Sequence, residues 1–366
     1  MRVKKRNRTV TCITSAIKMA GRIQTVLGAL DPTKLGQTLT HEHIRMDYQN
    51  CYIKPPREDH QDKIHDNKIN LRNLGFVRQY PYSHVYNLSF GDEDLQTMIA
   101  EVAEYKRLGG DSMVEVTTFG INPDYEFLKK VSEATNVNIV CSTGYYLGHT
   151  LTDEVKNESV ESLVKSMVND LTVGRNGIKA GCIGEIGCQY PLADSERKSL
   201  IAAAKAQAEV GCPLIIHPGR DEKSPFEIID ILKEAGADIS KTVMSHLDRT
   251  LVMDSDILLK FAAYSTCYLE FDLFGMEVSL YQANDNVDFP SDAQRIQMIK
   301  LLIKHGYEDR IVIAHDVHTR HRLLKYGGHG YGHIHENVLP MMLRRGISQN
   351  QINKILIDNP KRWLTF

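Results

Sequence analysis

Short apolar runs alternate with longer amphipathic segments along the chain from Gly36 onward. Most of the runs are continuously apolar, which is typical of parallel strands that are buried on both faces. The segments between them space their apolar positions as helices do. The runs predict eight strands, at residues 37–40, 112–118, 136–143, 181–186, 213–217, 242–246, 267–272 and 310–315.

Strand–helix alternation repeated about eight times predicts an α/β fold, a (β/α)8 TIM barrel. The alternative is an open doubly wound sheet, which is expected to carry a glycine-rich dinucleotide loop after its first strand, and none is visible here. Residues 50–90, rich in proline, tyrosine and charge, are too long for an ordinary βα connection. We predict that they form a loop or small excursion over the barrel mouth.

Helix start and stop signals support this pattern. Residues 224–227 and 291–294 have the spacing of capping boxes, and the first of them adds a proline at the start of the helix. Gly236 is predicted to close the helix that begins at 224. Residues 348–351 open a last helix, which Asn359-Pro360 is predicted to terminate.

We predict one domain over residues 21–366, preceded by a basic tail at residues 1–20. Residues 1–18 hold six lysines and arginines, and no acid precedes Asp31. Their apolar part is interrupted by threonines and a serine, which makes a poor signal peptide. A mobile tail is favoured, with a weak organelle-targeting segment, or a tail before an internal start at Met19, as alternatives.

Composition narrows the partners and the compartment. The seven cysteines are scattered without a Cys-x-x-Cys pair, which favours structural thiols in a reducing, cytoplasmic compartment. The formal net charge is −2, so no overall field attracts nucleic acid. The sequence has no apolar stretch of about 18 residues that could span a membrane. We expect a small-molecule partner, and the oligomeric state stays open, a homodimer included.

The first predicted strand ends in Thr40-His41-Glu42-His43. On a strand, residues i and i+2 face the same side, so His41 and His43 can address one metal ion while Glu42 points away. On a helix the two histidines would diverge. A single His-x-His pair is as often structural as it is a metal site.

Similar residues recur at the ends of other strands. His217, His246 and Asp316 come at the ends of the fifth, sixth and eighth runs, and Glu185 lies near the end of the fourth. Active sites of barrel enzymes lie at this carboxyl end. Four histidines and two carboxylates on one rim match the ligand types of a dinuclear metal site, with zinc as the expected metal.

Residues 36–43 resemble the first signature of the phosphotriesterase family, within the amidohydrolase superfamily. The resemblance continues through His217, His246 and Asp316 and covers nearly all of the chain from about Gly21 to Phe366. Residues 184–188, 217–220, 245–250 and 325–331 look like the phosphotriesterase-related subgroup. The basic tail falls outside the resemblance.

The resemblance implies how two divalent metal ions would be shared among these residues. His41, His43 and Asp316 would hold the more buried ion, and His217 and His246 the more exposed one. The bridge in the bacterial phosphotriesterases is a carboxylated lysine, whereas this chain has Glu185 there; Lys179 precedes the strand and belongs at the other end of the barrel. A glutamate bridge needs no carboxylation. Because the bridge differs, membership of the family would not by itself imply efficient triester hydrolysis.

Catalytic and substrate-binding roles are assigned from less specific features of the sequence. Asp316 is the expected general base for a metal-activated hydroxide, and its neighbour His315 should point to the opposite side of the strand. Arg220 and Arg249 follow two of the ligands and could bind an anionic substrate group. An ion pair with a nearby acid such as Asp248 is an equal alternative. The glycine-rich loop at 325–333 could fold over the mouth.

The family resemblance implies an amidohydrolase that cleaves small N-acetylated substrates, with N-acetyltaurine and N-acetyl amino acids as the expected compounds. An arginine near the metals would suit their sulfonate or carboxylate. One alternative is a lactonase or a phosphoester or phosphotriester hydrolase that uses the same site. Another is a metal-bearing scaffold without catalysis, against which stands the presence of all six competent ligands.

Overall fold

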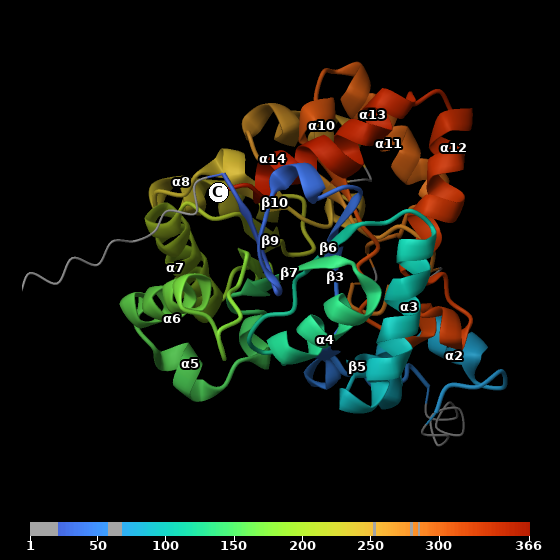
Figure 1. Ribbon diagram of the computed structural model, residues 1–366, viewed down its shortest axis with the longest axis horizontal. Coiled ribbons are helices and arrows are strands. Elements are labelled where there is room, and N and C mark those ends of the chain that lie inside the picture. The colour runs from blue at the N-terminus through green and yellow to red at the C-terminus, as the bar shows by residue number, and fades with distance from the viewer. Residues whose placement is uncertain (1–20, 58–67, 252–253, 279–280, 285) are drawn as a thin grey trace, which may run out of the picture.

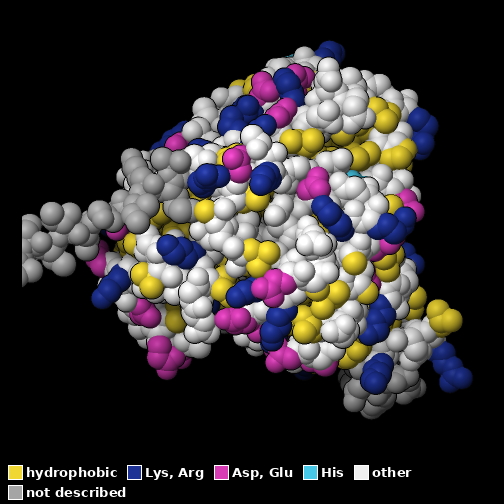
Figure 2. Space-filling model, viewed as in Figure 1, with side chains coloured by type: hydrophobic (Ala, Val, Ile, Leu, Met, Phe, Trp, Pro, Cys, Tyr) yellow, Lys and Arg dark blue, Asp and Glu magenta, His cyan; other side chains and the backbone are white. Residues whose placement is uncertain are grey.

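The computed structural model describes residues 21–57, 68–251, 254–278, 281–284 and 286–366. The predicted basic tail at residues 1–20 lies outside the described residues. None of the helices in the described ranges combines the length and the apolar composition that a membrane crossing requires. On the face shown in Figure 2, basic and acidic side chains are interspersed and form no broad patch of one sign.

The predicted (β/α)8 barrel is confirmed. Each of the eight predicted runs contains a strand, and neighbouring strands pair in parallel in one sheet within the described ranges. In chain order the strands are β3 (Thr38–Glu42), β6 (Ser112–Glu115), β7 (Asn138–Thr143), β8 (Cys182–Gly187), β9 (Leu214–His217), β10 (Thr242–Met244), β11 (Tyr268–Phe271) and β12 (Ile311–Ile313).

The barrel closes between its first and last strands, β3 and β12. Thr40 Oγ1 donates a hydrogen bond to Ile313 O at 3.3 Å. One step further along, the backbone N–H of Asp316 donates to His41 O at 3.1 Å. The seam therefore fixes two of the predicted metal ligands relative to each other through the backbone.

Helices cover the outside of the barrel (Figure 1). A principal helix separates each pair of successive strands, and further helices follow β12. The seven connecting helices are α3 (Leu95–Arg107), α4 (Tyr125–Thr135), α6 (Val160–Thr172), α7 (Asp194–Val210), α8 (Ser224–Glu234), α10 (Ser255–Tyr264) and α11 (Asp292–Lys304), with α12 (Leu339–Arg344), α13 (Gln349–Asn353) and α14 (Asn359–Leu364) after the last strand.

The three predicted helix starts are confirmed, but one of the predicted caps is wrong. Ser291 and Ser348 cap α11 and α13, each in a reciprocal box with the glutamine three residues later. At α8 the cap is Lys223, without a side-chain bond. The Ser224 hydroxyl instead accepts a hydrogen bond from the N–H of Gly219 at 2.9 Å, because the loop after β9 folds back onto it.

The predicted stop at Asn359-Pro360 is also wrong. The chain passes through a π-helical turn at Lys354–Asp358 and continues into α14, with Pro360 in its first turn. A proline is tolerated there because its missing N–H would have no helical partner. The Asn359 amide donates to Ile311 O at 2.7 Å and to Glu308 O at 2.9 Å, which ties this turn to the last strand.

The excursion between β3 and α3 reaches the mouth of the barrel, as predicted. It contains α2 (Leu74–Gln79) and several short turns, and residues 58–67 lie outside the described ranges. The N–H of Ile53 donates to Tyr82 O at 3.0 Å, so the two described arms of the excursion are joined. Tyr82 lines the pocket at the carboxyl ends of the strands.

The opposite end of the barrel is packed shut. Side chains from alternate positions of the strands, including Val114, Ile215 and Val312, form a fully buried cluster with Trp363 of α14. The indole Nε1–H of Trp363 donates to Lys241 O, just before β10, at 3.1 Å. A filled amino end leaves the carboxyl end of the strands as the place for a site.

Replacing Trp363 by alanine should lower the free energy of unfolding by about 3–5 kcal/mol, because it leaves a cavity at the base of the barrel. Equilibrium unfolding in denaturant measures the change. Trp363→Phe is the matched control and should lose distinctly less. Equal stability of the alanine variant and the wild type would show that this plug does not hold the barrel together.

Candidate metal centre

The six predicted metal ligands lie together at the carboxyl ends of the strands. Glu185 of β8 is at their centre: its Oε2 lies 2.7 Å from His217 Nδ1 and 3.4 Å from His246 Nε2. The same oxygen lies 3.4 Å from His41 Nε2, and Oε1 lies 3.5 Å from His43 Nε2. One carboxylate therefore faces all four histidines.

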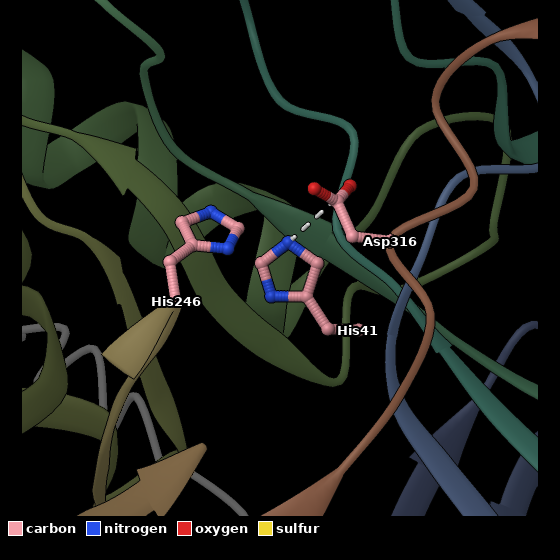
Figure 3. A group of neighbouring side chains, drawn as sticks. All are labelled: His41, His246 and Asp316. Atoms are coloured by element: carbon pink, nitrogen blue, oxygen red, sulfur yellow. Dashed lines mark ion pairs between the residues drawn. The ribbon is translucent and has the colours of Figure 1, made fainter. Parts of the chain in front are cut away.

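Asp316 completes the group from the other side. Its Oδ1 lies 3.3 Å from His43 Nε2 and 4.0 Å from His41 Nε2. Figure 3 shows the His41 ring between Asp316 and His246, with one ring nitrogen turned towards Asp316. His217 Nδ1 and His246 Nε2 lie 2.9 Å apart, so these two nitrogens face the same point.

Two of these residues have a left-handed backbone. His246 and Asp316 lie in the short turns after β10 and β12, with φ values of 54° and 52°. Residues other than glycine seldom adopt this conformation, which costs on the order of 1–3 kcal/mol and persists where the surroundings enforce it. The turn aims both side chains into the barrel mouth instead of along the sheet.

The donor set fits divalent metal ions. His41 Nε2 is buried and has no hydrogen-bond partner among the described atoms, although a buried polar atom normally has one. It points at the two carboxylates that a shared cation would neutralise. Imidazole nitrogens and carboxylate oxygens are the ligands that zinc and similar ions take in proteins.

The ionisation states of the residues in the centre also indicate a site for cations. Burial would raise the pKa of Glu185, but His217 and the other histidines hold it well below its usual value. Burial would also raise the pKa of Asp316, which His318 and His43 keep low. Conversely, burial alone would lower the pKa of His43, yet Asp316 and Glu185 raise it to about 9. The centre thus needs positive charge, which bound cations would supply in place of protons.

Two acids, Glu270 on β11 and Asp272 directly after it, belong to the centre and are not singled out by the sequence analysis. Asp272 Oδ1 lies 2.8 Å from His246 Nδ1, and its Oδ2 lies 3.3 Å from His41 Nδ1. Glu270 Oε2 lies 3.2 Å from the same His41 nitrogen. Acids in this position orient metal-binding imidazoles by accepting their second N–H. The two acids have the same i, i+2 spacing that identified His41 and His43, here in an otherwise apolar run.

His315 points away from the centre, as predicted. Its Nδ1 lies 2.7 Å from Glu42 Oε1, and its Nε2 accepts the N–H of Ile334 at 3.0 Å. Glu42, which lies between the two histidines of β3, also accepts the N–H of Val317 at 3.1 Å. These contacts brace the loop that carries Asp316.

The two predicted substrate-binding arginines differ. Arg249 is buried; its Nη2 donates to Pro218 O at 3.1 Å and lies 3.2 Å from His217 Nε2. Arg220 is half-buried, and its Nε donates to the hydroxyl of Tyr281. Neither arginine forms an ion pair with a carboxylate of the described ranges. Asp248, the acid considered as a partner, instead pairs with Arg295 at 2.8 Å. The structural ion-pair alternative with Asp248 is therefore wrong.

A pocket lies directly over the centre. Its floor is formed by five of the six predicted ligands, and both arginines reach it. The walls are mostly aromatic and aliphatic, and come from the segment between β3 and α3 and from the loops after β7, β11 and β12. The side chains of the walls are Met46, Tyr48, Tyr82, Tyr146, Leu273, Met276, Tyr281, Phe289 and His318. A small molecule with a polar centre fits such a site.

Fold and site together define a hydrolase-type (β/α)8 barrel with a candidate divalent metal centre. The model of the phosphotriesterase family matches residues 21–364, and the chain belongs to this family. The resemblance seen in the sequence is thereby confirmed.

Known proteins similar to the chain are hydrolases and related barrels. It is 59% identical over 349 residues to a phosphotriesterase-related protein of Nematostella vectensis, covering 95% of this chain and 99% of the relative. It is 52% identical over 350 residues, with the same coverage, to an N-acetyltaurine hydrolase of Xenopus tropicalis. A resiniferatoxin-binding protein from Rhodobacter sphaeroides has a TM-score of 0.89 at 32% identity, covering 94% and 95% of the two chains. The chain is a hydrolase of this family.

The central position of Glu185 generates a test of the metal centre. Glu185→Gln keeps the size of the side chain but removes its charge, so cations held in one cavity repel each other without compensation. The variant should lose at least one bound ion per chain while its circular dichroism spectrum stays unchanged. Elemental analysis after dialysis measures the loss, with Glu133→Gln on the exposed side of α4 as the control. If the Glu185→Gln variant kept its full metal content, Glu185 would not be needed to hold the ions.

Proposed function

We propose that the chain is a dinuclear metal-dependent amidohydrolase that cleaves N-acetyltaurine and related small N-acetylated anions. The observation that carries the proposal is the position of Glu185 within 3.5 Å of all four histidines. Above it lies a pocket that is reached by two arginines, neither of which has a carboxylate partner among the described residues. The relative named N-acetyltaurine hydrolase supports the substrate class.

His41, His43 and Asp316 would hold one ion, His217 and His246 the other, and Glu185 would bridge them. Two ions, with zinc as the expected metal, would supply a water nucleophile of lowered pKa and polarise the substrate carbonyl. Asp272 and Glu270 keep the imidazoles of His41 and His246 oriented.

Asp316 is the proposed general base. Its low pKa keeps it ionised at neutral pH, and its Oδ1 lies 3.3 Å from His43 Nε2, within the proposed metal centre. Its Oδ2 lies 3.1 Å from His318 Nδ1, which holds the carboxylate in this orientation. Asp316 accepts one proton of the attacking water and returns it to the amine nitrogen as the C–N bond breaks. The acetic acid that forms gives up the second water proton, so that the products at neutral pH are acetate and an ammonium group.

Arg220 is the proposed anchor for the anionic end of the substrate. Arg249 uses Nη2 on Pro218 O and therefore holds the segment after β9 in place. Arg220 has only its Nε bonded, to Tyr281, among the described residues, which leaves both terminal nitrogens for a sulfonate or carboxylate. The guanidinium carbon lies 5.3 Å from the centre of the Tyr281 ring, which fixes its position.

The substrate class is tested by a hydrolysis screen of metal-reconstituted protein. N-acetyl compounds, lactones and phosphotriesters are compared under the same conditions, and N-acetyltaurine should be hydrolysed with the highest kcat/KM. Activity on lactones or triesters alone would overturn the amide assignment. No activity on any class would support a metal-bearing scaffold.

Asp316→Asn separates proton transfer from metal binding. The amide oxygen can still coordinate, but it does not accept a proton near neutral pH. Turnover of N-acetyltaurine should fall by roughly 10²–10⁴-fold, the range that loss of a general base produces. Both metals are quantified in the same sample, because lost occupancy would mimic this effect. Near-normal turnover with full metal content would remove Asp316 from the mechanism.

Arg220→Gln should raise KM for N-acetyltaurine by roughly 10- to 100-fold, as expected for loss of a charge-assisted hydrogen bond. The kcat should change less, because the anion binds alike in the ground state and the transition state. Steady-state kinetics are compared with those of Arg344→Gln, an exposed control on α12. If the variant lost as much kcat/KM on neutral N-acetylethanolamine, Arg220 would not be an anion anchor.

A further inference from the structure

Three of the predicted ligands turn Nε2 towards Glu185 and Nδ1 outwards: His41, His43 and His246. The outward nitrogens of His41 and His246 face carboxylates directly. The outward nitrogen of His43 faces a hydroxyl instead, since Nδ1 lies 2.8 Å from Thr117 Oγ1. The partner of His43 is therefore a group that can either donate or accept a hydrogen bond.

A carboxylate lies behind this hydroxyl. Glu115 ends β6, and its Oε1 accepts the O–H of Thr117 at 2.6 Å. Oε1 also accepts the N–H of Ile44 at 3.1 Å, and Oε2 accepts the N–H of Thr117 at 3.3 Å. Because both oxygens act as acceptors, Glu115 fixes the direction in which the Thr117 hydroxyl points its proton.

The direction of the Thr117 hydroxyl decides which nitrogen of His43 carries a proton. A hydroxyl has one proton to donate, and Thr117 donates it to Glu115. Towards His43 the Thr117 oxygen can then only accept, so the proton lies on Nδ1. This leaves the lone pair of Nε2 for a metal ion. A hydroxyl turned the other way would donate to Nδ1 and place the ring proton on Nε2, where it would block coordination.

The three side chains of this chain of hydrogen bonds are shielded from solvent. Thr117 is fully buried, and Glu115 and His43 are 1% and 2% exposed. Water can therefore not replace a partner that is removed. The backbone of His43 is also fixed, because the Tyr331 hydroxyl donates to its carbonyl oxygen at 2.5 Å.

The arrangement follows from the pairing of two neighbouring strands. Glu115 and Thr117 have at the end of β6 the same two-residue spacing that His41 and His43 have at the end of β3. The two strands are parallel, with Glu42 opposite Glu115. The polar ends of both strands therefore lie at the same level of the barrel.

We propose that Glu115 and Thr117 are positioning residues of the metal centre. Glu115 orients the Thr117 hydroxyl, and this hydroxyl holds the His43 ring with Nε2 free to bind a metal ion. The inference rests on the proposed function, in which His43 shares one ion with His41 and Asp316. It adds a requirement for that ion which neither Glu270 nor Asp272 meets, since both contact other histidines.

Thr117→Val tests the role of the hydroxyl. The change keeps the shape of the side chain but leaves the Nδ1–H of His43 without an acceptor. The affinity for one of the two bound zinc ions should fall by about 10- to 100-fold, as it does when such a partner of a ligand is lost. The affinity for the other ion should stay at the wild-type value. Competition with a chromophoric chelator, in the absence of substrate, measures both affinities.

Two further variants separate the hydroxyl from a general effect on packing. Thr117→Ser keeps the hydroxyl and should retain the wild-type affinities. Thr242→Val, at the start of β10, is the control, because it removes a buried hydroxyl that donates to Asp238 O at 3.0 Å. Equal affinities in Thr117→Val and the wild type would overturn the proposal. A loss in Thr117→Ser as large as in Thr117→Val would also overturn it.

Glu115→Gln tests whether the carboxylate acts through Thr117. The amide of the variant can donate to Thr117 Oγ1, which frees the hydroxyl to donate to His43. The affinity for the same ion should fall severalfold. The double variant Glu115→Gln/Thr117→Val should bind this ion no more weakly than Thr117→Val alone, because both changes break one chain of contacts. Losses that add in the double variant would contradict the role of Glu115.

The failure of this inference can be told apart from failure of the proposed function. A wild type that binds two ions but hydrolyses no N-acetyl compound would contradict the proposed function, and the zinc affinities of the variants would still decide the roles of Glu115 and Thr117. Hydrolysis of N-acetyltaurine together with unchanged zinc affinities in Thr117→Val would contradict this inference alone. A wild type that binds no zinc would overturn both.

Discussion

The buried carboxylate of Glu185, surrounded by four histidines, is the interaction on which the rest of the structure depends. A charged group without solvent is costly unless opposite charge is close. The surrounding imidazoles supply that charge only if they carry protons or share metal ions with the carboxylate. Asp316, Asp272 and Glu270 add negative charge to the same space, so the centre is built to hold cations.

The barrel provides the geometry that this centre requires. Its amino end is filled by branched side chains and by Trp363, which leaves space for a site at the carboxyl end of the strands. The closing seam joins Asp316 N to His41 O, and the left-handed turns at His246 and Asp316 direct both side chains inwards. The aromatic walls then surround a pocket over the centre, and Arg220 reaches into it.

The sequence predicted the features that depend on the spacing of apolar and polar residues along the chain. Apolar runs located the strands, and two-residue spacing brought His41 and His43 to one face. The sequence did not reveal contacts made across the fold. The pairing of Asp248 with Arg295 instead of Arg249, and the loop contact that diverts Ser224 from its cap, depend on tertiary packing. Glu270 and Asp272 carried the same two-residue signal, and their role as partners of histidines follows only from their position in space.

Anomalous diffraction from crystals of the metal-loaded protein tests the central claim most directly. Data recorded on both sides of the absorption edge of the added metal locate each ion. The account predicts two peaks about 3.5–4 Å apart, as in bridged two-metal sites, with Glu185 between them. A single peak, or two peaks of which neither contacts Glu185, would contradict it.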